Sequence, residues 1–140
     1  MHASRFVFSA LLLGAAVTAH AEPADIKTLK GDWHLKVMDG YNVRKARAIL
    51  DFHPDTMQLE GFDSCNRITG KLHKHKDGTY TATLATTRMA CRNRLTSFVS
   101  KRLHKTIETE FQITSEKRYG MEGITIKSKK HDLFFRRMGE

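Results

Sequence analysis

Residues 68–84 decide the fold, and they read ITGKLHKHKDGTYTATL. The turn pair Asp77-Gly78 stands between two runs in which apolar and polar residues alternate. The alternating inward positions are Ile68, Gly70 and Leu72 before the turn, and Tyr80, Ala82 and Leu84 after it. Alternation of period two is typical of a half-buried strand, and Gly78 can adopt the positive φ of a tight turn without a Cβ clash. The stretch therefore predicts an antiparallel hairpin with one face in a core.

The same alternation recurs along the rest of the chain. The segments are 33–37, 48–52, 57–59, 111–113, 124–126 and 133–135. With the hairpin they make about eight short strands, and connections this short cannot carry parallel crossovers. We therefore predict a fold of the α+β class that is mainly antiparallel β, with a curved, partly barrel-like sheet of about eight short strands and one packed α-helix.

The predicted helix comes from a segment with a different period. Its apolar residues Leu95, Phe98, Val99 and Leu103 fall at i, i+3, i+4 and i+8, which lines one side of an α-helix. Asn93 can cap the start by accepting a hydrogen bond from a backbone N–H. The pattern predicts a single helix over residues 94–106, packed against the sheet.

The N-terminus predicts export. Residues 1–21 have a positive start at Arg5, an apolar run over 6–17 and a small-residue exit at Ala19-His20-Ala21, which together are typical of a cleavable signal peptide. The apolar run is too short to span a bilayer, which takes about 20 residues. Cleavage after Ala21 would leave a single domain over 22–140, with 22–28 as a loose lead-in and no lipid anchor. We expect a periplasmic or secreted protein, monomeric and without a transmembrane segment.

The charge balance favours anionic partners. Without Arg5, 23 basic residues stand against 15 acidic ones, a net charge of +8 for the exported part. In the cytosol this balance would favour nucleic acid, but export removes that target. Anionic lipid headgroups, cell-wall polymers and acidic proteins remain as partners.

The chain has two cysteines, Cys65 and Cys91, and both lie in the exported part. In an oxidising compartment the simplest outcome is a disulfide between them. On the chain-entropy estimate it would stabilise the fold by about 3–4 kcal/mol. The alternatives are a redox or nucleophilic cysteine and a metal ligand, although the C-x-x-C spacing of redox pairs is absent.

Two motifs around these cysteines resemble those of the META domain family, the family of the heat-shock protein HslJ. They are Ser64-Cys65-Asn66-Arg67-Ile68-Thr69-Gly70 and Thr86-Thr87-Arg88-Met89-Ala90-Cys91, and the end segments 29–33 and 133–137 fit the family's first and last strands. The resemblance implies a β-rich domain with one helix, found in bacterial envelope proteins often linked to stress, with no established enzymatic activity. The family commonly has Gly where Ser64 stands, so we expect the dihedral angles of this turn to differ. It also has acidic residues where this chain reads Arg92-Asn93-Arg94.

The disulfide would bring the two motif loops together. Their polar residues form the candidate binding surface, which consists of Asn66, Arg67, Thr86, Thr87 and Arg88. Guanidinium groups fork onto carboxylate or phosphate, so this surface could accept an anion. The alternative, which we favour, is that Asn66 satisfies backbone groups of the turn and the threonines pair along a strand.

Other chemistry is weakly supported. His73 and His75 would point to one side of a strand, but two ligands make a poor metal site, so we expect a solvated hairpin end, no metal and no cofactor. A Gly-x-Ser-x-Gly elbow, a phosphate-binding glycine loop and a paired-carboxylate motif are all absent from the sequence, which favours a protein that is not an enzyme. Four aromatic residues could line a ligand cavity but are more typical of a core. They are Trp33, Phe52, Phe111 and Phe135.

The function predicted from the sequence is that of an exported, non-catalytic envelope protein of the META/HslJ type. It would be stress-related and bind another envelope component. One alternative is an inhibitor or adaptor that docks on an acidic protein partner, since a small disulfide-braced domain is a rigid platform. Another is a carrier of a small apolar ligand.

Overall fold

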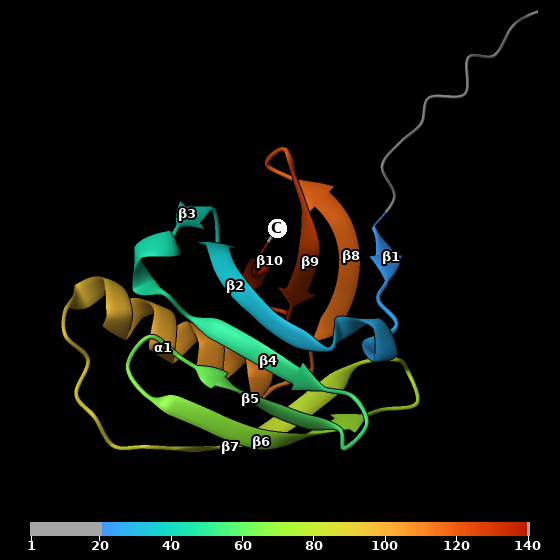
Figure 1. Ribbon diagram of the computed structural model, residues 1–140, viewed down its shortest axis with the longest axis horizontal. Helices are drawn as coiled ribbons and strands as arrows, with labels where there is room; N and C mark the ends of the chain where they lie inside the picture. Colours follow the sequence, from blue (N-terminus) through green and yellow to red (C-terminus); the bar gives the residue numbers. More distant parts are fainter. Residues whose placement is uncertain (1–20, 140) are drawn as a thin grey trace, which may run out of the picture.

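An antiparallel sheet and one α-helix make up the part of the chain that the structure describes (Figure 1). The computed structural model describes residues 21–139. The predicted signal peptide, residues 1–21, lies outside them except for Ala21. The ten strands are β1 (Glu22–Pro23), β2 (Gly31–Met38), β3 (Tyr41–Asn42), β4 (Ile49–His53), β5 (Gln58–Phe62), β6 (Arg67–Lys74), β7 (Tyr80–Thr86), β8 (Gln112–Arg118), β9 (Met121–Lys127) and β10 (Asp132–Arg137). The helices are the short 3-10 turns η1 (Ile26–Leu29) and η2 (Arg44–Ala46) and the α-helix α1 (Arg94–Ile107).

The sheet is curled but open. Its strands run in the order β1-β8-β9-β10-β2-β4-β5-β6-β7, with β3 paired to β2 off this path. The curl brings Tyr80 at the start of β7 to Phe111 just before β8, where each backbone N–H donates to the other's carbonyl oxygen at 2.8 and 2.9 Å. This single bridge does not extend into a ladder, so the sheet is not closed into a barrel. The predicted antiparallel, partly barrel-like architecture is confirmed.

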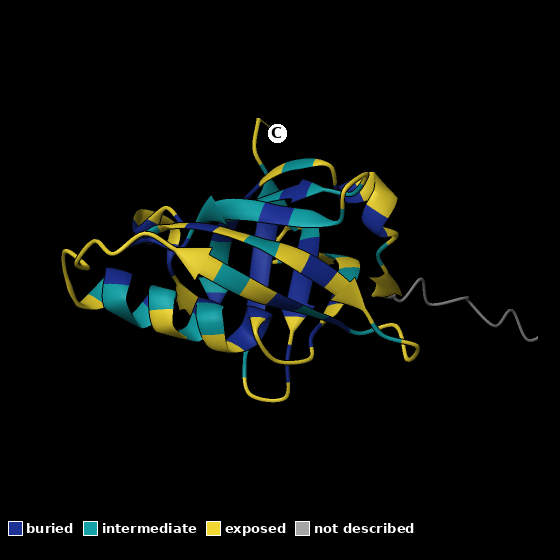
Figure 2. Cartoon of the chain, turned by 90° about the horizontal axis from the view of Figure 1, so that it is seen from below, coloured by how far each residue is buried: buried dark blue, intermediate teal, exposed yellow. Residues whose placement is uncertain are grey.

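Helix α1 connects β7 to β8, which lie toward opposite ends of the curled sheet. Its buried face includes Val99, Leu103 and Ile107, and its remaining residues are mostly of intermediate burial, with Lys101 and Lys105 exposed (Figure 2). At its start the Asn93 side chain accepts a hydrogen bond from the Thr96 N–H at 2.9 Å, while the Thr96 hydroxyl accepts one from the Asn93 N–H at 3.1 Å. This capping box satisfies two backbone donors. The predicted span of 94–106 is confirmed to within one residue.

All eight strands expected from alternation are present, and the two additional strands, β1 and β3, have only two residues each. The expectation of a loose lead-in over 22–28 is wrong. Glu22 and Pro23 pair with β8, and η1 buries Ile26 and Leu29 against the core. Two residues are too few to show an alternating pattern, and their partners lie about 90 residues further along the chain.

An irregularity in β2 changes which residue faces the core. The alternation predicts Trp33, Leu35 and Val37 on one face. In the structure Phe134 pairs with Val37 and Phe135 with Leu35, which leaves Lys36 as the extra residue of a β-bulge. The bulge reverses the alternation beyond it, so Met38 is fully buried and Val37 is not.

The four aromatic residues weighed as cavity walls are members of one core cluster. Phe52, Phe111 and Phe135 are almost fully buried, and Trp33 is 6% exposed. The Trp33 Nε1–H donates to the Leu29 carbonyl oxygen at 3.0 Å, which satisfies its polar group. Their packing is that of a core and not of a cavity wall.

The capping box provides the first test. Replacing Asn93 with Ala removes the acceptor for the Thr96 N–H, and loss of an N-cap costs about 1 kcal/mol. We expect the Asn93→Ala variant to unfold at lower urea concentration with an unchanged m-value. An unchanged midpoint would show that the cap does not stabilise α1.

Candidate binding surface around the disulfide

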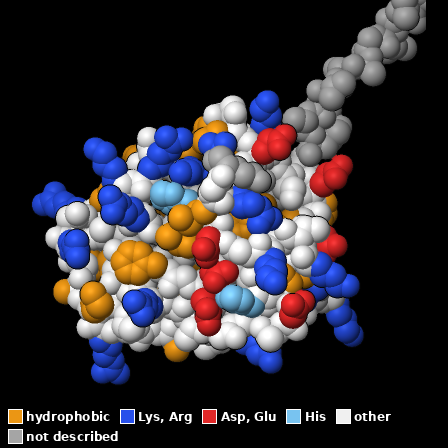
Figure 3. Space-filling model, viewed as in Figure 1, with side chains coloured by type: hydrophobic (Ala, Val, Ile, Leu, Met, Phe, Trp, Pro, Cys, Tyr) orange, Lys and Arg blue, Asp and Glu red, His pale blue; other side chains and the backbone are white. Residues whose placement is uncertain are grey.

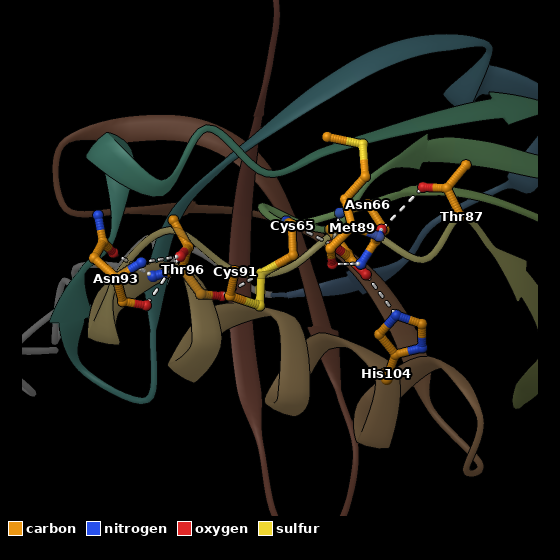
Figure 4. Close-up of a disulfide and its surroundings, with 9 residues drawn as sticks. Cys65, Asn66, Thr87, Met89, Cys91, Asn93, Thr96 and His104 are labelled. Atoms are coloured by element: carbon orange, nitrogen blue, oxygen red, sulfur yellow. Dashed lines mark hydrogen bonds and ion pairs between the residues drawn. A yellow bond between two sulfur atoms is a disulfide. The ribbon is translucent and has the colours of Figure 1, made fainter.

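The disulfide joins Cys65, between β5 and β6, to Cys91, just before α1 (Figure 4). The two cysteines are 26 residues apart in sequence, and their Cα atoms are 4.7 Å apart. The predicted pairing is confirmed. It brings together the two loops that carry the candidate binding surface.

The Asn66 side chain joins the segment before Cys91 to the turn that contains Cys65. Its side-chain oxygen accepts hydrogen bonds from the Thr87 hydroxyl, at 3.0 Å, and from the Met89 N–H. Its side-chain nitrogen donates to the Met89 carbonyl oxygen at 3.1 Å. Asn66 therefore satisfies backbone groups of the neighbouring loop and not those of its own turn, where the side chain of Asp63 accepts the N–H bonds instead.

The threonines of the surface pair along the strands. The Thr87 hydroxyl accepts a hydrogen bond from the Arg67 N–H at 3.1 Å, and Thr86 pairs with Ile68 in the β6–β7 ladder. The polar groups of Asn66 and Thr87 are thus occupied within the protein. The guanidinium groups of Arg67 and Arg88 belong to exposed residues, so they are the members of the predicted set that can meet a ligand.

Residues 85–94, which we call the arginine loop, run from the last two residues of β7 to the first residue of α1 and are exposed throughout. The loop carries Arg88, Arg92 and Arg94 and no acidic residue. Within residues 21–139, the ion pairs made by arginine involve only Arg102 and Arg118. The arginines of the loop are therefore charged groups without an acidic partner in the described chain. Met89, between them, is 63% exposed.

The buried carboxylate of Asp63 joins the Cys65 turn to α1 by hydrogen bonds. Asp63 is 1% exposed, and one of its oxygens accepts hydrogen bonds from the N–H groups of Cys65 and Asn66 at 2.7 and 2.6 Å. The other lies 2.7 Å from Nε2 of His104 on α1. No pattern in the sequence predicts this pair, because His104 lies 41 residues beyond Asp63 and nothing local relates them. An Asp two residues before Cys65 was the available signal of an Asx turn.

The pair shifts the pKa values of both groups. Burial opposes ionisation of Asp63, but hydrogen bonds from His104, Asn66 and Cys65 outweigh it and hold the pKa of the carboxyl below its usual value. The hydrogen bond to Asp63 raises the pKa of His104 despite partial burial, and Glu108 adds to the effect. The charged pair therefore stabilises the fold below the usual histidine pKa of about 6.5 and loses strength as the pH rises through the raised value. At the acid end its contribution is lost as Asp63 becomes protonated.

This gives a pH-dependent prediction. The His104→Gln variant keeps a donor but cannot become charged. Relative to the parent protein, the variant should lose about 1 kcal/mol more unfolding free energy at about pH 6 than at about pH 9. The reason is that a hydrogen bond between charged groups is stronger than one that involves a neutral histidine. Urea unfolding at both pH values measures it, with exposed His73→Gln as the control. An equal loss at both values would contradict the charged pair.

Ser64 has a strained backbone. Its φ is 86°, in the left-handed region that favours glycine and costs a residue with a Cβ atom conformational energy. Its hydroxyl is buried and has no hydrogen-bond partner among the described residues. Both features cost stability.

Replacing Ser64 with Gly should therefore stabilise the protein. Relief of strain and removal of the buried hydroxyl outweigh the greater freedom of glycine in the unfolded chain, and we expect a gain of about 1 kcal/mol. Ser64→Ala removes the hydroxyl but keeps the strain, so it should gain less. Thermal and urea unfolding measure both, and a Gly variant no more stable than the Ala variant would exclude strain at this position.

Within residues 21–139, His73 and His75 do not belong to any group of three side chains that could hold a metal ion. Nε2 of His75 lies 3.0 Å from the Thr81 hydroxyl across the hairpin, as expected of a solvated hairpin end. The hairpin turn itself is as predicted, with Gly78 at φ 85°.

Three of the predicted residues also line a hollow of about 620 Å³ on the sheet. Arg67, Thr86 and Thr87 form one part of its wall, and the carboxylates of Asp51 and Glu60 lie in another. The predicted surface therefore continues from the arginine loop into a concave region that is lined by both cationic and anionic side chains.

These features define a class of protein, a small antiparallel β domain with one helix, a disulfide and an exposed cationic loop. The META domain family model matches residues 25–139, and the chain belongs to this family. Comparison with curated proteins finds no match. Within residues 21–139, no helix has the length and apolar character needed to cross a membrane.

Two solved structures share the fold. One is an NMR structure of a protein from Burkholderia xenovorans, with a TM-score of 0.63 and 21% identity over 90% of this chain and 94% of that one. The other is an NMR structure described only as that of a protein, with a TM-score of 0.64 and 21% identity over 81% of this chain and 95% of that one. At this level of identity the likeness establishes the fold.

Proposed function

We propose that this META domain protein is exported and binds an anionic component of the cell envelope through the arginine loop, in a non-catalytic, stress-related role. The observation that carries the proposal is the exposure of Arg88, Arg92 and Arg94 on one loop without acidic partners in the described chain. Guanidinium groups bind phosphate and carboxylate with two parallel hydrogen bonds, which suits such a ligand.

The way the loop is held supports binding. The disulfide at Cys91 and the hydrogen bonds of Asn66 to Met89 fix it at two points. A loop that is already ordered loses less conformational entropy when a ligand binds.

Two features support a location outside the cytosol. The Cys65–Cys91 disulfide is typical of oxidising compartments. Residues 1–21 have the three parts of an export signal. In that setting anionic headgroups and cell-wall polymers are available to a basic protein.

A second candidate function is the adaptor or inhibitor that docks on an acidic protein. Met89 favours it, because an exposed Met among arginines is a composition enriched in protein interfaces. A protein partner would bury Met89, whereas a headgroup would contact mainly the guanidinium groups.

The proposal is tested with vesicles of phosphatidylcholine, with and without phosphatidylglycerol. We expect the protein to cosediment with the anionic vesicles at low salt and to be released at high salt. Each basic residue near an anionic surface contributes about 1 kcal/mol, so the triple variant Arg88→Ala, Arg92→Ala, Arg94→Ala should bind about 100-fold more weakly. The charge-matched control, Lys27→Ala, Lys45→Ala, Lys117→Ala, removes three exposed cations elsewhere and should bind much more tightly than the triple arginine variant.

Equal weakening in both triple variants would show that net charge, and not the loop, determines binding. Failure to bind anionic vesicles, together with salt-sensitive capture of one acidic envelope protein that the arginine variant loses, would favour the adaptor. Failure of both would exclude the loop as a binding surface.

A further inference from the structure

Three carboxylates lie in a row across neighbouring strands of this basic protein. Asp32 on β2 pairs with Asp51 on β4, and Asp51 pairs with Glu60 on β5. Like charges directly opposite one another on adjacent strands are destabilising. Figure 3 shows acidic side chains gathered around a histidine on the face of Figure 1, within a surface that is otherwise rich in Lys and Arg.

His53 completes the group two residues beyond Asp51 on β4. Its Nε2 atom lies 2.9 Å from Oδ2 of Asp51 and 3.3 Å from Oε2 of Glu60. The donor atoms of Asp51, His53 and Glu60 all lie within 4.8 Å of one another. Within residues 21–139, this is the one group of three or more His, Cys, Asp and Glu side chains arranged in this way.

These separations are close to those of ligands on a metal ion. Metal–ligand distances of about 2.0–2.1 Å place two tetrahedral ligands about 3.3 Å apart. We propose that Asp51, His53 and Glu60 form a binding site for one divalent transition-metal ion of the Zn²⁺ type. The site was not among the residues considered from the sequence, where His73 and His75 were the histidines weighed as ligands.

The identity of the donors selects the class of metal. One imidazole nitrogen with two carboxylate oxygens suits Zn²⁺ and its neighbours, whereas Ca²⁺ and Mg²⁺ prefer oxygen ligands alone. The other oxygen of Glu60 accepts a hydrogen bond from the Gln58 side chain at 3.3 Å, which orients the carboxylate. Two adjacent strands supply all three ligands, so the ladder fixes their spacing.

The site leaves coordination positions open toward solvent. His53 and Glu60 are 40% and 47% exposed in their side chains, and Asp51 is 26% exposed. Asp51 and Glu60 also line the hollow of about 620 Å³ that contains Arg67. Three protein ligands with a free position is the arrangement in which a metal ion also takes water or an anionic group.

Isothermal titration of the untagged, disulfide-intact protein with Zn²⁺ tests the site. We expect one Zn²⁺ per chain and no binding of Ca²⁺ or Mg²⁺ under the same conditions. His53→Gln and Glu60→Gln should each weaken Zn²⁺ binding at least tenfold, because each removes a direct ligand. The control His73→Ala, His75→Ala removes two histidines near the β6–β7 hairpin turn and should leave the affinity within about twofold, since neither belongs to the site.

A second readout locates the ion. Zn²⁺ should shift the Nε2 resonance of the His53 imidazole in ¹⁵N NMR spectra, and thermal melts without metal should show that both single variants fold. No binding by the parent protein, unchanged affinity in the folded His53→Gln variant, or loss of binding in the His73/His75 control would each overturn the proposal. The vesicle experiment changes only arginines and lysines outside this group, so the two proposals can fail separately.

Discussion

The hydrogen bonds of the buried Asp63 carboxylate are the interactions on which the candidate binding surface depends. A charged group with 1% exposure is tolerated only when hydrogen bonds replace its lost water, and here two backbone N–H groups and the His104 side chain do so. Through these bonds one carboxylate orders the Cys65 turn and fixes it against α1. The disulfide and Asn66 then extend that order to the arginine loop.

The residues that hold the two loops together are different from the arginines that a ligand could contact. The Cys65–Cys91 disulfide and the Asn66 side chain hold the two loops together. The arginines project from that support without acidic partners in the described chain. Because the support is already ordered, a ligand at the arginines would lose little binding free energy in ordering the loop.

Charge is distributed unevenly over a protein whose net charge is positive. The arginine loop is cationic, while the row from Asp32 to Glu60 is a local concentration of carboxylates. Arg67 and Glu60 line the same hollow, so a ligand placed there would meet both kinds of charge. The solved structures share the fold at 21% identity, and a shared fold does not transfer the chemistry of such surface groups.

The sequence by itself determined the features that depend on neighbouring residues. Alternation located eight strands, the spacing of Leu95, Val99 and Leu103 located α1, and a chain with only two cysteines allowed one intramolecular pairing. Only the tertiary structure decided the features that depend on register between distant segments. The bulge that buries Met38, the ion pair of Asp63 with His104 and the cluster around His53 arise from how strands and helix are placed against one another. A local pattern shows which face a residue occupies, but the partner across the sheet is set by long-range pairing and packing.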